Sequence, residues 1–229
     1  MAMFAPQQPL VMRDLPPDVR YRRLAEATTP SRVRAAVVAL AGLNAACLLL
    51  MRSTLSVAVA GPEGLAAAYG WSNTERGVVL GAFFYGYVAC QVPGGLVATK
   101  AGAKPVLLAG MALSVAASLL TPAAADAGLH TVVAARVALG LGQGCMYPAY
   151  AALFGAWLPH HEQGKGIALA NLGDTLGSIA GMTLTPPLMA STLGWRAAFV
   201  GPGLLGVLWL VAWWLLGATS SPEHHPTIS

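Results

Sequence analysis

Three ionisable side chains stand inside long apolar stretches of this sequence, and their chemistry needs an explanation. They are Arg52, Arg136 and Asp174. A charge is costly to place in a lipid bilayer, and charged residues within membrane spans commonly mark functional sites. The guanidinium group of arginine presents a planar set of donors that matches a carboxylate or a phosphate. Two guanidinium groups that face one cavity repel each other unless an anion joins them, so Arg52 and Arg136 predict a shared anion site.

The positions of the two arginines favour a common depth. Arg52 lies about eight residues from the end of the first apolar stretch, and Arg136 about five residues into the fourth. At 1.5 Å per helical residue, they lie roughly 12 Å and 8 Å below the same membrane surface. The alternatives are that both side chains extend to that surface, or that they form structural salt bridges.

Polar residues at helical spacing extend the predicted site. Arg136, Gly140, Gln143 and Tyr147 are four, three and four residues apart, which places them on one helix face. We therefore predict that Arg52, Arg136, Gln143 and Tyr147 bind substrate. Gly140, Gly142 and Gly144 have the wrong spacing for a dinucleotide-binding fingerprint and follow no strand, so close helix packing explains them better.

Asp174 shares a helix face with Asn171, Gly177, Ser178 and Gly181. It either carries a coupling ion or neutralises an intramembrane arginine by charge pairing. The sequence leaves both roles open.

Six apolar segments must position these residues, each with roughly the 20 residues that a membrane-spanning helix needs. Apolar residues make up 56% of the 229 residues, and only 10% are charged. The segments are too long for barrel strands, so the prediction is an all-α polytopic membrane protein. They lie at about 35–60, 77–98, 105–125, 131–157, 166–193 and 197–218, between a polar basic tail (1–34) and a short polar tail (219–229).

Positive charges are distributed unequally among the connections. With a cytoplasmic N-terminus, the outer side holds only Arg76 and Arg196. The inner side then holds Arg13, Arg20, Arg22, Arg23, Arg32, Arg34, Lys100, Lys104 and Lys165. Because cytoplasmic loops carry the excess of positive charge, both termini are predicted to be cytoplasmic.

Several other classes of function find no support. No nucleophile with a base, phosphate loop or metal-ligand spacing is visible, which argues against an enzyme, a cofactor or a metal site. His160, His161 and Glu162 are predicted to be solvated loop residues. Cys47, Cys90 and Cys145 stand in apolar runs and read as small buried side chains. The basic residues show no interleaving with aromatic residues, which argues against nucleic acid as a partner.

The segment between the second and third apolar stretches resembles the signature loop of the major facilitator superfamily. Gly95, Lys100, Gly102 and Lys104 match that pattern, while Thr99 replaces its acid and Ala103 one of its bases. The resemblance implies that this segment takes part in gating.

A longer resemblance, over about residues 35–229, is to the anion:cation symporter family within that superfamily. It is carried by Phe83-Phe-Tyr-Gly-Tyr87, Gln91-Val-Pro-Gly-Gly95, Arg136-Val-Ala-Leu-Gly-Leu-Gly-Gln-Gly144, Tyr147-Pro148 and Gly194-Trp195. The resemblance implies that Arg52, Arg136 and Tyr147 line a substrate cavity. It also implies six transmembrane helices built as two inverted three-helix repeats, forming the N-terminal half of a twelve-helix fold. Gln143 and Leu80 replace an acid and a histidine of the proton-linked glutamate branch, and the helix-five pattern is nearer the plastid phosphate branch.

The resemblance therefore implies a secondary active transporter of a small anion, either inorganic phosphate or an organic carboxylate, working by alternating access. A coupling cation, H⁺ or Na⁺, a plastid membrane and a second six-helix half or a homodimer would fit this role. The alternative is a truncated, non-transporting half that is inert or regulates a full-length relative.

Overall fold

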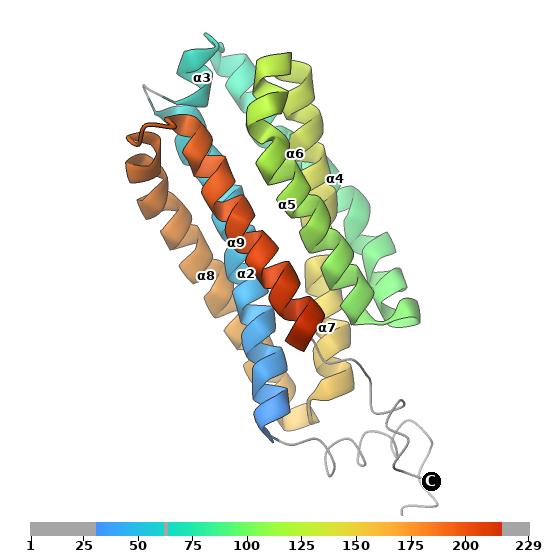
Figure 1. Cartoon of the computed structure of the whole chain (residues 1–229). Helices are drawn as coiled ribbons and strands as arrows, with labels where there is room; N and C mark the ends of the chain where they lie inside the picture. Colours follow the sequence, from blue (N-terminus) through green and yellow to red (C-terminus); the bar gives the residue numbers. More distant parts are fainter. Residues whose placement is uncertain (1–30, 62–63, 217–229) are drawn as a thin grey trace, which may run out of the picture.

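The computed structural model describes residues 31–61 and 64–216, and every regular element in these ranges is a helix. The predicted all-α class is confirmed. The helices run up and down in one bundle, with α3 and α7 near opposite ends (Figure 1). Most of the two predicted polar tails lies outside the described residues. The elements are α2 (Ser31–Ala60), α3 (Leu65–Ala68), α4 (Asn73–Ala101), α5 (Ala103–Ala127), α6 (Leu129–Gly144), α7 (Met146–Trp157), α8 (His160–Met189) and α9 (Trp195–Leu216).

Four helices in the described ranges are each long and apolar enough to cross a membrane: Arg34–Ala60, Asn73–Ala101, Ala103–Ala127 and Trp195–Leu215. They correspond to the first, second, third and sixth predicted segments. The fifth predicted segment is the helix α8, which is 30 residues long but is not among these four. Its polar Asn171 and Asp174 lower its apolar character.

The fourth predicted segment is two helices rather than one. The break falls at Cys145, between α6 and α7. Pro148 explains it, because a proline has no N–H and its ring clashes with the carbonyl group four residues earlier, here that of Gly144. In α7 the same proline occupies the first turn, where the missing N–H costs little. Together, α6 and α7 run from the α3 end of the bundle to the opposite end (Figure 1).

Two connections are shorter than the sequence indicates. Instead of a six-residue loop at 99–104, Gly102 alone separates α4 from α5, with a φ of 86° that favours glycine. Instead of a loop at 158–165, Leu158 and Pro159 alone separate α7 from α8, so His160, His161 and Glu162 form the first turn of α8. The two histidines are exposed as predicted, but Glu162 pairs with Arg34 of α2 at 3.3 Å.

Helix α2 packs mainly on α8, and α4 packs mainly on α6. An inverted repeat would relate α2 to α6–α7, α4 to α8 and α5 to α9. Under this repeat the α2–α8 pair corresponds to the α4–α6 pair. Glycines line both seams: a Cβ on Gly140 would lie 2.0 Å from the Phe83 carbonyl oxygen, and one on Gly177 would lie 2.1 Å from that of Ala46. The prediction that Gly140, Gly142 and Gly144 serve close helix packing is confirmed, since small residues let helix backbones approach in a membrane.

Candidate functional site

A group of polar side chains lies where α7 and α8 meet. The Tyr147 hydroxyl donates a hydrogen bond to the Asp174 carboxylate and lies 3.1 Å from the Asn171 side-chain oxygen. Tyr147 is 41% exposed, Asn171 is exposed and Asp174 is partly buried. The polar stripe predicted on the fourth segment therefore contacts the acid of the fifth segment, through the hydrogen bond from Tyr147 to Asp174.

Arg52 of α2 is the cation that interacts electrostatically with this group. Its guanidinium carbon lies 4.4 Å from the centre of the Phe83 ring, 5.1 Å from that of Phe84 and 5.9 Å from that of Tyr87. Its charge acts on both Asp174 and Tyr147. Among the described residues, no carboxylate lies within ion-pair distance of Arg52. We name Arg52, Tyr147, Asn171 and Asp174 the polar face.

Arg136 lies in the interior of the bundle instead. It is 1% exposed, and its Nη2 donates to the Thr121 hydroxyl of α5 at 2.9 Å. Its guanidinium carbon lies 5.8 Å from the centre of the Phe199 ring of α9. The Nε of Arg136 has no hydrogen-bond partner among the described residues, which also place no carboxylate within ion-pair distance of its guanidinium.

Gln143 is also buried, and it ties two helices together. Its amide nitrogen donates to the Leu48 carbonyl oxygen of α2 at 3.0 Å. About two helical turns further along the chain, the Tyr150 hydroxyl donates to the Asn44 side chain of α2. Both bonds satisfy buried polar groups and hold α6 and α7 against α2.

The residues predicted to bind substrate or to act in ion coupling thus divide into two sets. Arg52, Tyr147 and Asp174 lie close together, whereas Arg136 and Gln143 point into the interior, and no contact joins Arg52 to Arg136 in the described ranges. A binding site shared by the two arginines stays a prediction. The sequence did not predict which residues the arginines contact. Arg52 lies over an aromatic bed formed by Phe83, Phe84 and Tyr87. Arg136 contacts Thr121 and Phe199. The aromatic run at 83–87 was the only feature of the sequence that could have indicated these contacts.

The predicted gating segment lies at the end of the bundle opposite α3. Gly95 lies within α4 and is partly buried, and Lys100 is exposed in the last turn of that helix. Gly102 makes the tight connection, and Lys104 lies partly buried in the first turn of α5. The segment is therefore a helix-to-helix corner rather than a free loop.

A second charged group closes the α3 end of the bundle. Arg196 at the start of α9 pairs with Asp126 near the end of α5 at 2.8 Å, and the Tyr69 hydroxyl also donates to Asp126. Burial and the hydrogen bond to Asp126 both raise the pKa of Tyr69, so this phenol stays protonated and donates. Every member of this group has a partner within the group.

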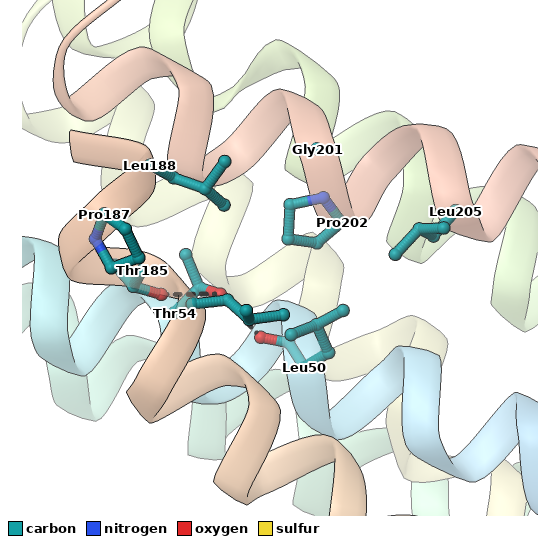
Figure 2. A pocket seen from close by; sticks show the side chains of 9 residues that line it. Leu50, Thr54, Thr185, Pro187, Leu188, Gly201, Pro202 and Leu205 are labelled. Atoms are coloured by element: carbon teal, nitrogen blue, oxygen red, sulfur yellow. Dashed lines mark hydrogen bonds between the residues drawn. The ribbon is translucent and has the colours of Figure 1, made fainter. Parts of the chain in front are cut away.

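A cavity of about 510 Å³ opens between α2, α8 and α9 (Figure 2). Its polar atoms are mainly the Thr54 and Thr185 hydroxyls, which lie 3.4 Å apart and already bond to the carbonyls of Leu50 and Gly181. The cavity has no charged side chain and includes no predicted site residue, so it is a poor place for an anion. It is lined by Leu50, Thr54, Leu184, Thr185, Pro187, Leu188, Gly201, Pro202 and Leu205.

A helical membrane bundle with arginines inside it, built from paired three-helix repeats, is the architecture of one half of a secondary transporter. The family model of the Major Facilitator Superfamily matches residues 41–229, and the chain belongs to that superfamily, within its anion:cation symporter family. The chain is 37% identical over 205 residues to a probable anion transporter 4, chloroplastic, of Arabidopsis thaliana, covering 89% of this chain and 37% of that protein.

Two further relatives show the same partial coverage. Sialin of Ovis aries is 36% identical over 161 residues, which are 70% of this chain and 32% of sialin. The sodium-dependent phosphate transport protein 1, chloroplastic, of Arabidopsis thaliana is 37% identical over 164 residues, which are 72% of this chain and 32% of that protein. The chain spans about a third of the length of the curated relatives it matches.

Proposed function

We propose that this chain forms one six-helix half of a secondary active transporter that carries a small anion by alternating access. The observation that carries the proposal is an excess of positive charge inside the bundle. The bundle holds two intramembrane arginines and one acid, Asp174, which of the two interacts with Arg52 alone, and no described carboxylate lies within ion-pair distance of either arginine. A desolvated cation costs several kcal/mol when it is unpaired. An anion that enters the bundle would offset this cost, which gives the arginines a reason to be there.

Each predicted binding residue has a chemical role in this proposal. Arg52 leaves its aromatic bed to bind the anion with two parallel N–H donors, since cation–π contacts are worth only about 0.5–2 kcal/mol. Arg136 supplies a fixed positive charge from the interior, which attracts the same anion at longer range. Tyr147 and Gln143 donate a hydroxyl and an amide hydrogen. The transport role needs no bond-making step, so the proposal includes no enzyme activity or cofactor.

The names of the relatives narrow the proposed substrate and location. A chloroplastic, sodium-dependent phosphate transport protein among the relatives supports inorganic phosphate as the substrate, Na⁺ as one candidate coupling ion and a plastid membrane as the location. An organic carboxylate stays an alternative, because a guanidinium group binds both kinds of oxygen anion. Both termini would lie on the cytoplasmic side, as the charge asymmetry indicates.

The proposal also needs a second half. The polar face lies at the surface of this chain, and a transport site must be closed alternately from either side of the membrane. A second six-helix half, or a second copy of this chain, would cover it. The corner at Gly95, Lys100, Gly102 and Lys104 would then gate access at the end of the bundle opposite α3.

Uptake of labelled phosphate and glutamate into proteoliposomes tests the proposal. Arg136→Ala is expected to abolish uptake, because the deeply buried charge disappears. Arg196→Ala is the matched control, since Arg196 is half exposed and already paired with Asp126. Uptake that is unchanged in Arg136→Ala, or reduced equally by both substitutions, would contradict the assignment of Arg136 to the binding site.

A further inference from the structure

Asp174 is the one acid within the described helices that interacts with both the phenol of the polar face and an intramembrane arginine. The charged and titratable groups that act on it are Arg52 from α2 and Tyr147 and Tyr150 from α7. Helix α9 also packs on α8, but its described ionisable residue, Arg196, is bound to Asp126 at the α3 end. Among the ionisable groups around it, the direct hydrogen-bond partner of Asp174 is Tyr147, and the cation that acts on it is Arg52.

We propose that Asp174 is a proton-binding carboxyl group whose protonation is coupled to anion binding at Arg52, an inference that rests on the proposed function. With no anion present, the positive charge of Arg52 favours the ionised carboxylate. An anion bound to Arg52 cancels that charge and increases the proton affinity of Asp174. Because coupling free energies are reciprocal, a proton on Asp174 strengthens anion binding by the same factor.

The hydrogen bond from Tyr147 adds a second connection between proton and anion. The phenol has one O–H group. While the carboxyl is ionised, this group donates its hydrogen bond to Asp174. Once Asp174 is protonated, its own O–H can donate to the Tyr147 oxygen or to the Asn171 side-chain oxygen. The Tyr147 hydroxyl is then free to donate to the anion, so each bound proton adds a donor to the site.

A proton fits this position better than a sodium ion does. The contacts around Asp174 bring together three side-chain oxygens, those of Tyr147, Asn171 and Asp174 itself. Hard cations such as Ca²⁺ take about six to eight oxygen ligands, and Mg²⁺ takes an octahedron. A proton needs one acceptor and one hydrogen-bond partner, both of which are present.

The test measures the affinity of the purified chain for phosphate and for glutamate at several values between about pH 5.5 and pH 8, where the side chain of glutamate stays ionised. The wild-type affinity is expected to rise as the pH falls, by up to about tenfold per pH unit for one coupled proton. Asp174→Asn, which imitates the protonated carboxyl, is expected to bind at all pH values as tightly as the wild type does at low pH. Phosphate itself titrates in this pH range, but it does so equally for both proteins. The difference in affinity between the wild type and Asp174→Asn therefore reports Asp174 alone.

Three further variants make the test decisive. Asp174→Glu retains a carboxyl group and should keep a pH dependence, and Tyr147→Phe should weaken it. Thr175→Ala, an exposed change one residue away, should leave it intact. If Asp174→Asn keeps the wild-type pH dependence, or removes a dependence on Na⁺ instead, the inference is wrong. If the wild type and Arg52→Ala both fail to bind either anion at every pH, the proposed function has failed, and the inference with it.

Discussion

The two intramembrane arginines occupy equivalent helices of the inverted repeats but very different surroundings. Arg52 lies on α2, partly exposed, over three aromatic rings and within electrostatic reach of Asp174. Arg136 lies on α6, fully buried between α5 and α9, with one threonine hydroxyl as its hydrogen-bond partner. The equivalent helices thus each carry a cation, but at different positions along the helix and in different environments: Arg52 lies in the last third of α2, and Arg136 lies in the middle of α6. Arg52 is placed to exchange partners, whereas Arg136 provides a fixed interior charge.

The largest expected effect comes from Arg136→Met, which keeps the volume and removes the charge. Anion affinity should fall at least about 100-fold, equal to about 2.7 kcal/mol. Thermal stability should hold or increase, because replacing an incompletely paired buried ion with an apolar side chain of similar size is often stabilising. Binding titration and thermal unfolding of the same sample measure both quantities. A loss of binding that only accompanies unfolding would remove the distinction between the two arginines.

The next effect tests the α4–α6 seam that holds Arg136 inside the bundle. A Cβ on Gly86 would lie 2.0 Å from the Val137 carbonyl oxygen, whereas one on Gly81 of the same helix would meet nothing within 4 Å. Gly86→Ala should lower the free energy of unfolding by about 1–3 kcal/mol through overpacking. Gly81→Ala should be neutral or stabilise the protein by up to about 1 kcal/mol, because alanine favours helix. Equal stabilities of the two variants would contradict this packing.

A smaller effect is expected from Arg52→Lys. The lysine keeps the positive charge but loses the planar fork and the flat contact with the aromatic rings. Anion affinity should fall about tenfold, or about 1.4 kcal/mol, with little change in stability. Phe84→Leu, which removes one ring of the aromatic bed, serves as the comparison and should change affinity less. Full affinity in Arg52→Lys would show that Arg52 acts as a point charge alone.

The smallest effect is expected at the α3 end. Arg196→Ala removes an exposed ion pair with Asp126, and such pairs contribute about 0–1 kcal/mol. The loss in melting temperature should be small at low salt and smaller still at high salt, where exposed charges are screened. Anion affinity should not change. A large, salt-independent loss would mean that this group stabilises the bundle as strongly as the glycine seams do.

Much of the fold could be predicted because a bilayer restricts the chain so strongly. Apolar runs of helical length require helices, and the glycine spacing at 140–144 indicated a packing face that the structure confirms. The break at Cys145 was missed, although Pro148 was a visible signal. The ends of helices were also misjudged: Gly102 and Pro159 allow far tighter connections than polar composition at 99–104 and 158–165 indicated.

The sequence by itself determined that charged residues would stand inside a helical bundle and which residues they are. This follows from residue type, because the charges interrupt long apolar runs. Their depth below the membrane surface stays a prediction. Only the tertiary structure decided which way each side chain points and what it meets. Arg136 faces Thr121 and Phe199 rather than Arg52, and Tyr147 joins Asp174, because these contacts depend on how helices distant in sequence rotate and cross at their glycine seams.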